Sequence, residues 1–348
     1  MVDSVRAPFA LVIALGAVLV VGGSHPGVAA QTPPALSASA GGVTVSAADV
    51  SQMLAQAAQA AMTLNYTGTI LYSRRGTVET SRIVHRYDNG VEMERIVTLD
   101  GPPVEVIRMN DELTCYLADS RIKRIESRTG QQGFPSLLPR QQSTLAQHFT
   151  VRKLEVERVA GHEAQVWLFE PTDEFRFWHK LWTELKTGLW LRGRVIDERG
   201  QTIEEITFTD LTIGGRIDRE MVKPTLASKV GQWRVERVDR ITPSGGARTE
   251  SQWLAQGLPA GFVKIREGVM RGLPGHGESV THLLFSDGLS SVSVYASSLR
   301  PGETVSAGAS VQGPHQVFTR QAGDAVVTAF GDARPAAVRA IANAVSRR

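Results

Sequence analysis

The sequence has little cysteine, little excess charge and no long apolar run. Its 348 residues include one cysteine, Cys115, so the chain forms no internal disulfide and no cysteine-based zinc site. Lys and Arg number 38 and Asp and Glu number 35, and the formal charge of +3 is small for a nucleic-acid-binding protein. No basic run with interspersed aromatic residues occurs, so we expect no nucleic-acid partner.

The most apolar segment, residues 9–21, is shorter than the roughly 20 residues that span a bilayer. Arg6 precedes this segment and the small residues 28–30 follow it, which is the pattern of a secretory signal peptide. We predict that residues 1–30 are removed and that the mature protein is exported and soluble. A retained membrane anchor is the alternative. A lipoprotein anchor is excluded because no cysteine directly follows the run.

The first half of the mature chain has the pattern of a helix followed by many short strands. Residues 31–45 are rich in Pro, Gly, Ser and Ala and predict a flexible leader. Residues 47–62 predict a helix that begins at Ser46 and has an alanine-rich apolar stripe. Short β-type segments separated by turn signals follow, which predicts an antiparallel meander. We assign residues 46–213 to a first domain.

The second half begins after a predicted linker, residues 214–231. A second set of strands starts at Trp233, and a helix at 335–345 begins with proline in its first turn. We assign residues 232–348 to a smaller second domain. We found no sequence repeat between the two domains.

Aromatic residues occur on both faces of several strands of the first domain. A strand with one solvent-exposed face alternates apolar and polar residues, and these strands do not. We therefore expect the helix to cover one face and an apolar groove for acyl chains or a peptide to lie on the other. Placement of each aromatic residue in the ordinary core is the alternative. The predicted groove residues are Trp167, Phe169, Phe177, Trp178, Trp182 and Trp190, with Phe134, Leu137 and Leu138 of a nearby apolar loop.

The two halves differ in charge. Residues 31–213 hold 20 basic and 23 acidic side chains, whereas residues 214–348 hold 17 and 11. This difference favours contact of the second half with an anionic partner or surface. The alternative is that these basic side chains are simply scattered over the surface. The basic residues predicted to contact lipid phosphates or acidic partner segments are Arg234, Arg237, Arg240, Arg248, Lys264 and Arg266.

The motifs of common catalytic sites are missing or misplaced. The sequence has no HExxH and no GxSxG. Residues 120–123 match SxxK, 186–188 match KTG and 286–288 approximate SDN, as in penicillin-recognising serine enzymes. However, the SxxK string lies in a predicted strand, where residues three apart point to opposite faces, and the order of the other two motifs is reversed. We therefore predict that the protein is not an enzyme and has no metal or cofactor.

Several strings resemble one family, the periplasmic sigma-E regulatory proteins RseB/MucB. They are residues 65–69 (NYTGT), 181–189 (LWTELKTGL), Trp253 with 258–262 (LPAGF), and 282–295 (HLLFSDGLSSVSVY). Each string is weak alone, but their order and spacing are specific, and the similarity covers nearly all of the mature chain.

The resemblance implies an α+β protein with two domains. The first would be a strongly curved antiparallel half-barrel with helices, similar to the lipoprotein carriers LolA and LolB, and the second a smaller α+β domain. Members bind the periplasmic part of a RseA/MucA-type anti-sigma factor and shield it from site-1 proteolysis. Lipopolysaccharide or lipoprotein is thought to release that shield.

Two further functions stay open at this stage. One is a periplasmic lipid or lipoprotein carrier of LolA type, which would not need the second domain. The other is the serine hydrolase, which the strand context of Ser120 disfavours. The sequence also leaves open whether the protein forms a homo-oligomer.

Overall fold

The computed structural model describes residues 41–74, 76–127, 145–229, 231–238, 252–271, 279–299, 302, 304–312 and 315–348. Among these residues, no helix has both the length and the apolar character needed to cross a membrane. Some predicted features lie outside the described residues: the signal peptide, most of the leader, Phe134, Leu137, Leu138, Arg240 and Arg248.

Helix α1 (Ala47–Thr63) begins where the sequence predicts. The hydroxyl of Ser46 accepts a hydrogen bond from the backbone N–H of Asp49 at 3.2 Å and donates one to its carboxylate at 2.7 Å. The buried face of the helix contains four small or medium side chains and two large ones, which lets the helix lie close against a sheet. The buried residues are Val50, Met53, Leu54, Ala57, Ala60 and Ala61.

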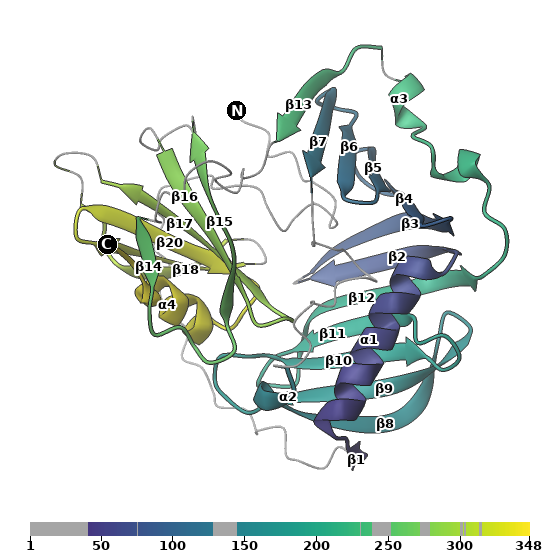
Figure 1. The fold of residues 1–348 in the computed structure, drawn as a ribbon, viewed down its shortest axis with the longest axis horizontal. Coiled ribbons are helices and arrows are strands. Elements are labelled where there is room, and N and C mark those ends of the chain that lie inside the picture. The colour runs from purple at the N-terminus through teal and green to yellow at the C-terminus, as the bar shows by residue number, and fades with distance from the viewer. Residues whose placement is uncertain are drawn as a thin grey trace.

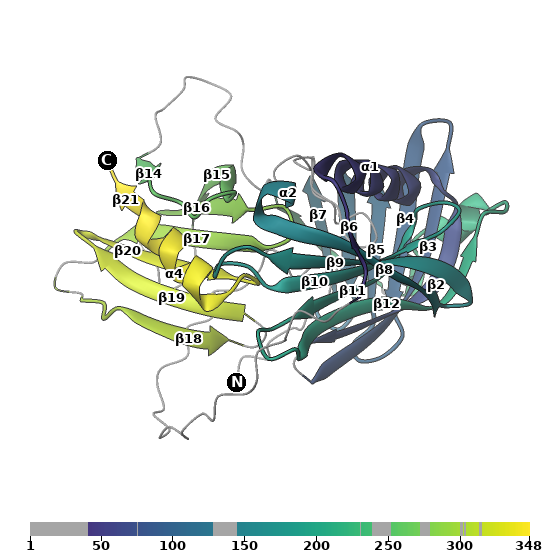
Figure 2. The same cartoon turned by 90° about the horizontal axis from the view of Figure 1, so that it is seen from below.

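The first sheet is large, curved and open, and α1 lies across its strands (Figures 1 and 2). The thirteen strands follow the order β1-β8-β9-β10-β11-β12-β2-β3-β4-β5-β6-β7-β13, and the described edge strands β1 and β13 do not pair with each other. This confirms the predicted half-barrel. The strands are β1 Val43–Thr44, β2 Tyr66–Arg74, β3 Thr77–Asp88, β4 Val91–Thr98, β5 Val104–Met109, β6 Glu112–Leu117, β7 Ile122–Ser127, β8 Phe149–Val159, β9 His162–Pro171, β10 Trp178–Glu184, β11 Trp190–Ile196, β12 Thr202–Ile213 and β13 Arg234–Val238.

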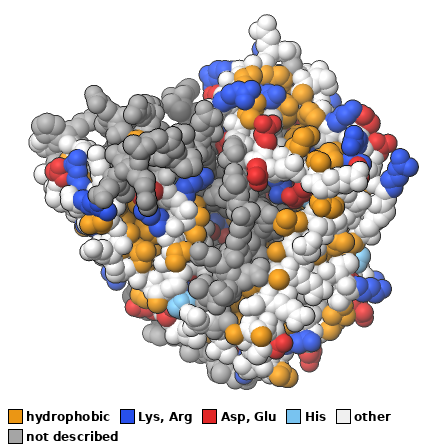
Figure 3. Space-filling model, viewed as in Figure 1, with side chains coloured by type: hydrophobic (Ala, Val, Ile, Leu, Met, Phe, Trp, Pro, Cys, Tyr) orange, Lys and Arg blue, Asp and Glu red, His pale blue; other side chains and the backbone are white. Residues whose placement is uncertain are grey.

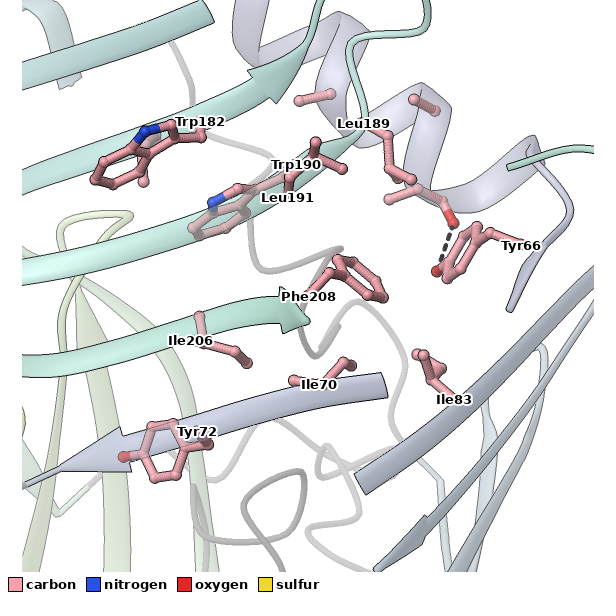
Figure 4. Close-up of a cluster of buried hydrophobic side chains, with 14 of the residues drawn as sticks. Tyr66, Ile70, Tyr72, Ile83, Trp182, Leu189, Trp190, Leu191, Ile206 and Phe208 are labelled. Atoms are coloured by element: carbon pink, nitrogen blue, oxygen red, sulfur yellow. Dashed lines mark hydrogen bonds between the residues drawn. The ribbon is translucent and has the colours of Figure 1, made fainter. Parts of the chain in front are cut away.

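The main core lies between α1 and the sheet. Tyr66 stacks on His85 with ring centroids 4.6 Å apart and donates its hydroxyl hydrogen to the carbonyl of Ala61 on α1 at 3.4 Å. Figure 4 shows Tyr66, Phe208 and Leu189 converging beneath the helix. A short helix, α2 (Leu145–His148), leads into β8.

The C-terminal sheet is smaller and separate, as expected. Its six strands follow the order β15-β16-β17-β20-β19-β18, all antiparallel, and helix α4 (Pro335–Ala344) packs on β19 and β20. A two-stranded pair, β14 with β21, lies beside α4. The strands are β14 Trp253–Ala255, β15 Val263–Arg271, β16 Ser279–Ser286, β17 Ser291–Ser298, β18 Gly308–Gln312, β19 His315–Ala322, β20 Ala325–Gly331 and β21 Val345–Arg347.

The segment predicted as a linker is docked on the first sheet. It contains η3 (Arg219–Val222) and α3 (Leu226–Lys229), and Ile217 and Val222 are buried against Val84 and Met93. The strand that we expected to open the second set, β13, instead runs parallel to β7 at the edge of the first sheet. The sequence pattern of a five-residue strand specifies no partner, so the docked linker decides which edge it reaches.

Candidate functional site

A cavity of about 420 Å³ opens between the N-terminal half of α1 and the end of the β10–β11 hairpin. Its volume lies within the range of small-ligand sites, roughly 300–1,000 Å³. The wall combines apolar, amide and charged side chains. The lining residues are Val45, Asp49, Gln52, Met53, Gln56, Lys153, Gln165, Trp167, Thr183, Glu184, Leu185 and Gly188.

Trp167 is the aromatic wall of this cavity. Its indole N–H donates to the hydroxyl of Thr183 at 2.9 Å, which fixes the ring plane. The ammonium of Lys153 lies 5.9 Å from the ring centroid, within the range of a cation–π contact. The arrangement places a half-buried indole next to a positive charge, and Asp49 and Glu184 add two carboxylates to the same lining. The cavity therefore suits a ligand with a polar head and an apolar part.

The hairpin end of the cavity is built by Glu184. Its carboxylate accepts hydrogen bonds from the backbone N–H groups of Lys186 at 3.0 Å and Thr187 at 2.7 Å, and from the Thr187 hydroxyl at 2.7 Å. Burial raises the pKa of Glu184, but these hydrogen bonds outweigh it and hold the pKa below its usual range. The string 186–188 is therefore a turn held by a carboxylate, and Gly188 leaves room for Gln56 of α1.

The amide side chains of the cavity are not among the predicted site residues. Gln52 and Gln56 lie on the polar flank of α1, one turn apart, and Gln165 donates to the carbonyl of Leu154 at 2.6 Å. The spacing of positions 49, 52 and 56 was the available signal, since such positions share one helix face. No sequence pattern predicts which residues of the sheet would lie opposite that face of α1.

The other predicted aromatic residues that the structure describes do not line the cavity. Phe169 packs against Phe149 in the core, with ring centroids 5.9 Å apart, and Phe177 and Trp190 are also buried. Trp182 follows the opposite parity from Thr183 and points to the other side of the sheet. There its indole donates to Glu157 at 2.9 Å. Trp178 shares the parity of Trp182 and is half-buried.

Cations cover the ring of Trp182. Lys180 lies 4.8 Å from the ring centroid, and Arg192 and Arg194 each lie 5.4 Å away. Lys180 also pairs with Glu157, and both arginines pair with Glu205. On this side of the sheet, ion-paired cations therefore cover the buried indole of Trp182.

The predicted basic residues lie on two different sheets. Arg234 and Arg237 are exposed on β13, and Arg234 pairs with Glu236 at 3.0 Å. Lys264 on β15 pairs with Glu267 at 2.6 Å, and Arg266 is half-buried. Figure 3 shows Lys and Arg side chains spread over the visible face on both sheets. Their contact with an anionic partner stays a prediction.

The serine-enzyme motifs are separated in space. The Ser120 hydroxyl donates to the carbonyl of Leu117 at 3.4 Å in the turn before β7, and Lys123 lies over the ring of Tyr116. The SDN-like triplet 286–288 lies on the C-terminal sheet. Within the described ranges, no group of three His, Cys, Asp or Glu side chains is arranged to hold a metal ion.

Two relatives of known name match most of the chain. The chain is 29% identical over 300 residues to the sigma factor AlgU regulatory protein MucB of Pseudomonas aeruginosa, covering 82% of this chain and 87% of that one. It is 24% identical over 301 residues to the sigma-E factor regulatory protein RseB of Salmonella typhimurium, covering 85% and 90%.

Solved structures and family models agree with these relatives. The complex of Pseudomonas aeruginosa MucA and MucB matches with a TM-score of 0.69 and 26% identity, covering 86% of this chain and 99% of that one. MucB in complex with MucA(peri) matches with a TM-score of 0.66 and 27% identity, with the same coverage. The family model of the MucB/RseB N-terminal domain matches residues 49–226, and that of the C-terminal domain matches residues 247–346. Because both domains of this family are present in the same order, the chain belongs to the MucB/RseB family.

Proposed function

We propose that this protein binds the periplasmic part of a RseA/MucA-type anti-sigma factor and shields it from site-1 proteolysis. One observation carries the proposal: the similarity to MucB bound to MucA(peri) extends over 86% of the chain, and so includes both sheets. A simple carrier of LolA type would need only the first sheet. In this proposal the protein is exported to the periplasm after loss of residues 1–30 and acts by binding, without catalysis.

Titration of the mature chain with the periplasmic segment of its own anti-sigma factor tests this function. We expect binding in the micromolar range or tighter, and protection of the segment from a DegS-like protease in the same mixture. A peptide of equal length and net charge but shuffled order is the control. Equal affinity for both peptides, or no binding of the native segment, would overturn the proposal.

Release by lipid or lipoprotein is the second part of the proposal. The cavity beside Trp167 supports it, because the cavity offers an indole and Met53 next to Lys153 and the amides of α1. An amphiphile that binds there would lower the affinity of the protein for the anti-sigma factor, because the two binding sites are coupled. A hundredfold change in that affinity corresponds to a coupling free energy of about 3 kcal/mol. The same cavity favours the alternative of a lipid carrier, and transfer of labelled lipid between vesicles without effect on the anti-sigma segment would favour that alternative.

A further inference from the structure

Arg176 is buried to 1% exposure, although it lies in the loop between β9 and β10. A fully buried guanidinium is rare unless charged and polar groups surround it. Within its own loop it pairs with the carboxylate of Asp173. The remaining partners of Arg176 come from elsewhere in the fold.

Most of these partners belong to the C-terminal part of the chain. The Nε atom of Arg176 lies 2.8 Å from Oδ2 of Asp287, an ion pair whose angle falls outside that of a hydrogen bond. Its Nη2 atom donates to the carbonyl of Ala260 at 2.6 Å. The guanidinium lies 5.1 Å from the ring centroid of Phe262 and 5.9 Å from that of Phe149 on β8. One side chain thus contacts both sheets.

Two strings singled out in the sequence meet at this guanidinium. Residues 258–262 supply Ala260 and Phe262, and the turn between β16 and β17 supplies Asp287. The Oδ1 atom of Asp287 accepts the backbone N–H groups of Leu289 at 3.0 Å and Ser290 at 2.8 Å. The same carboxylate therefore shapes its own turn and holds that turn on the first sheet.

The packing around Arg176 crosses the boundary in both directions. Phe175 packs against the core of the C-terminal sheet, and Leu289 packs against the core of the first sheet. Gly261, at a φ of +82°, has no room for a side chain, because a Cβ atom would lie 2.4 Å from the ring of His148 and 2.6 Å from Arg176. The two sheets thus interlock around the charge of Arg176.

We propose that Arg176 is a positioning residue that fixes the orientation of the C-terminal sheet on the first sheet. A partner that contacts both sheets then meets a preformed surface and does not have to order two mobile domains, which would weaken its affinity. The link to partner binding rests on the proposed function, whereas the effect on domain orientation does not.

Other contacts also cross the boundary, and they shape the expected result. Arg334, which precedes α4, lies 3.4 Å from Glu198, and Asp332 lies close enough to Arg74 to contribute to the raised pKa of its guanidinium. These contacts keep the sheets associated when Arg176 is lost. We therefore expect a wider range of orientations, not complete separation.

Double electron–electron resonance on the full mature chain tests this role without any partner. Spin labels are attached through Thr150→Cys on β8 and Ala309→Cys on β18, both at exposed positions, while the native Cys115 is buried and stays unlabelled. The parent chain should give one narrow distance distribution. Arg176→Met should at least double its width, and Arg176→Lys, which keeps the charge but not the planar fork, should give an intermediate width.

Arg194→Met is the matched control. Arg194 also pairs with a carboxylate, Glu205 at 2.8 Å, and also lies over an aromatic ring, but all its partners belong to the first sheet. This variant should keep the narrow distribution. If Arg176→Met does not fold, Asp287→Asn, which keeps an oxygen for the turn, decides the question. A parental distribution in the variant that folds would overturn the proposal.

The anti-sigma segment then provides a second readout. With the proposed function correct, Arg176→Met should weaken binding of the segment at least tenfold, and Arg194→Met should not. If the parent chain itself does not bind the segment, the proposed function fails while the distance distributions still decide the role of Arg176. If binding is unchanged although the distribution widens, Arg176 does not position the partner surface and that part of the proposal is overturned.

Discussion

Glu105 on β5 holds Thr225 of the linker. The buried carboxylate accepts the Thr225 backbone N–H at 2.8 Å and its hydroxyl at 3.1 Å, and accepts the N–H of Leu226 at 2.7 Å. Arg95 on β4 pairs with the same carboxylate at 2.6 Å. One acidic side chain, 120 residues earlier in the sequence, therefore adds to the burial of Ile217 and Val222 in attaching the connection to the first sheet.

Glu105→Ala should release this linker. The variant loses several hydrogen bonds to one buried carboxylate and leaves Arg95 without it, so we expect a loss of about 3 kcal/mol in the free energy of unfolding. Trypsin should cleave after Lys229 faster than in the parent chain, whereas Lys223 precedes Pro224 and is not a trypsin site. Glu112→Ala, at an exposed position of β6, is the control and should change neither quantity. Equal cleavage rates in the two variants would contradict the role of Glu105.

Gly257 and Gly261 offer a matched pair for the domain junction. Both have positive φ angles, +71° and +82°, but a Cβ atom at Gly257 would meet nothing within 4 Å. Gly257→Ala should cost about 1 kcal/mol for the left-handed backbone alone. Gly261→Ala adds a clash with His148 and Arg176 and should cost about 2 kcal/mol more. Urea unfolding measures both, and similar values would show that the junction adapts easily.

Glu204 should make stability depend on pH. Burial raises its pKa to about 7, Arg74 at 3.2 Å opposes this and Asp332 adds to it. The folded state binds the proton of Glu204 more tightly than the unfolded state does. The stabilisation from this proton is therefore fully present below pH 4.5, the ordinary pKa of a glutamate, and is lost as pH rises through 7. The loss amounts to about 3 kcal/mol.

Glu204→Gln should remove this pH dependence. The free energy of unfolding, measured with urea between about pH 5 and about pH 8, should fall more steeply in the parent chain than in the variant. Parallel curves would mean that Glu204 is already ionised across this range in the folded protein.

Trp167 and Trp178 test which aromatic residues contact a ligand. Both are half-buried, but Trp167 lines the cavity and Trp178 lies on the other side of the sheet. Trp167→Ala should weaken binding of a fluorescent diacyl lipopeptide about tenfold, or about 1.4 kcal/mol, and Trp178→Ala should leave it unchanged. Fluorescence titration measures the lipopeptide affinity of both variants. A larger loss of affinity in the Trp178 variant would place the ligand on the other face of the sheet.

The comparison between sequence and structure shows where local patterns are sufficient. Ser46 and the alanine stripe predicted α1 because capping and helical periodicity act over one or two turns. The turn at residues 186–188 is local in the same way, since its backbone N–H groups donate to Glu184 beside it. In contrast, the strand from Arg234 was assigned to the wrong sheet, because pairing with β7 depends on how the linker docks.

The sequence alone determined the two long helices, most strands, the two-sheet organisation and the family, all of which follow from short-range patterns and their order. Tertiary structure decided which tryptophan borders a cavity and which is covered by cations, because strands packed on both sides lose the alternation that would distinguish their faces. It also decided the burial of Arg176, whose backbone partner Ala260 is 84 residues away. No local pattern specifies a contact over that distance; only the packing of one sheet against the other creates it.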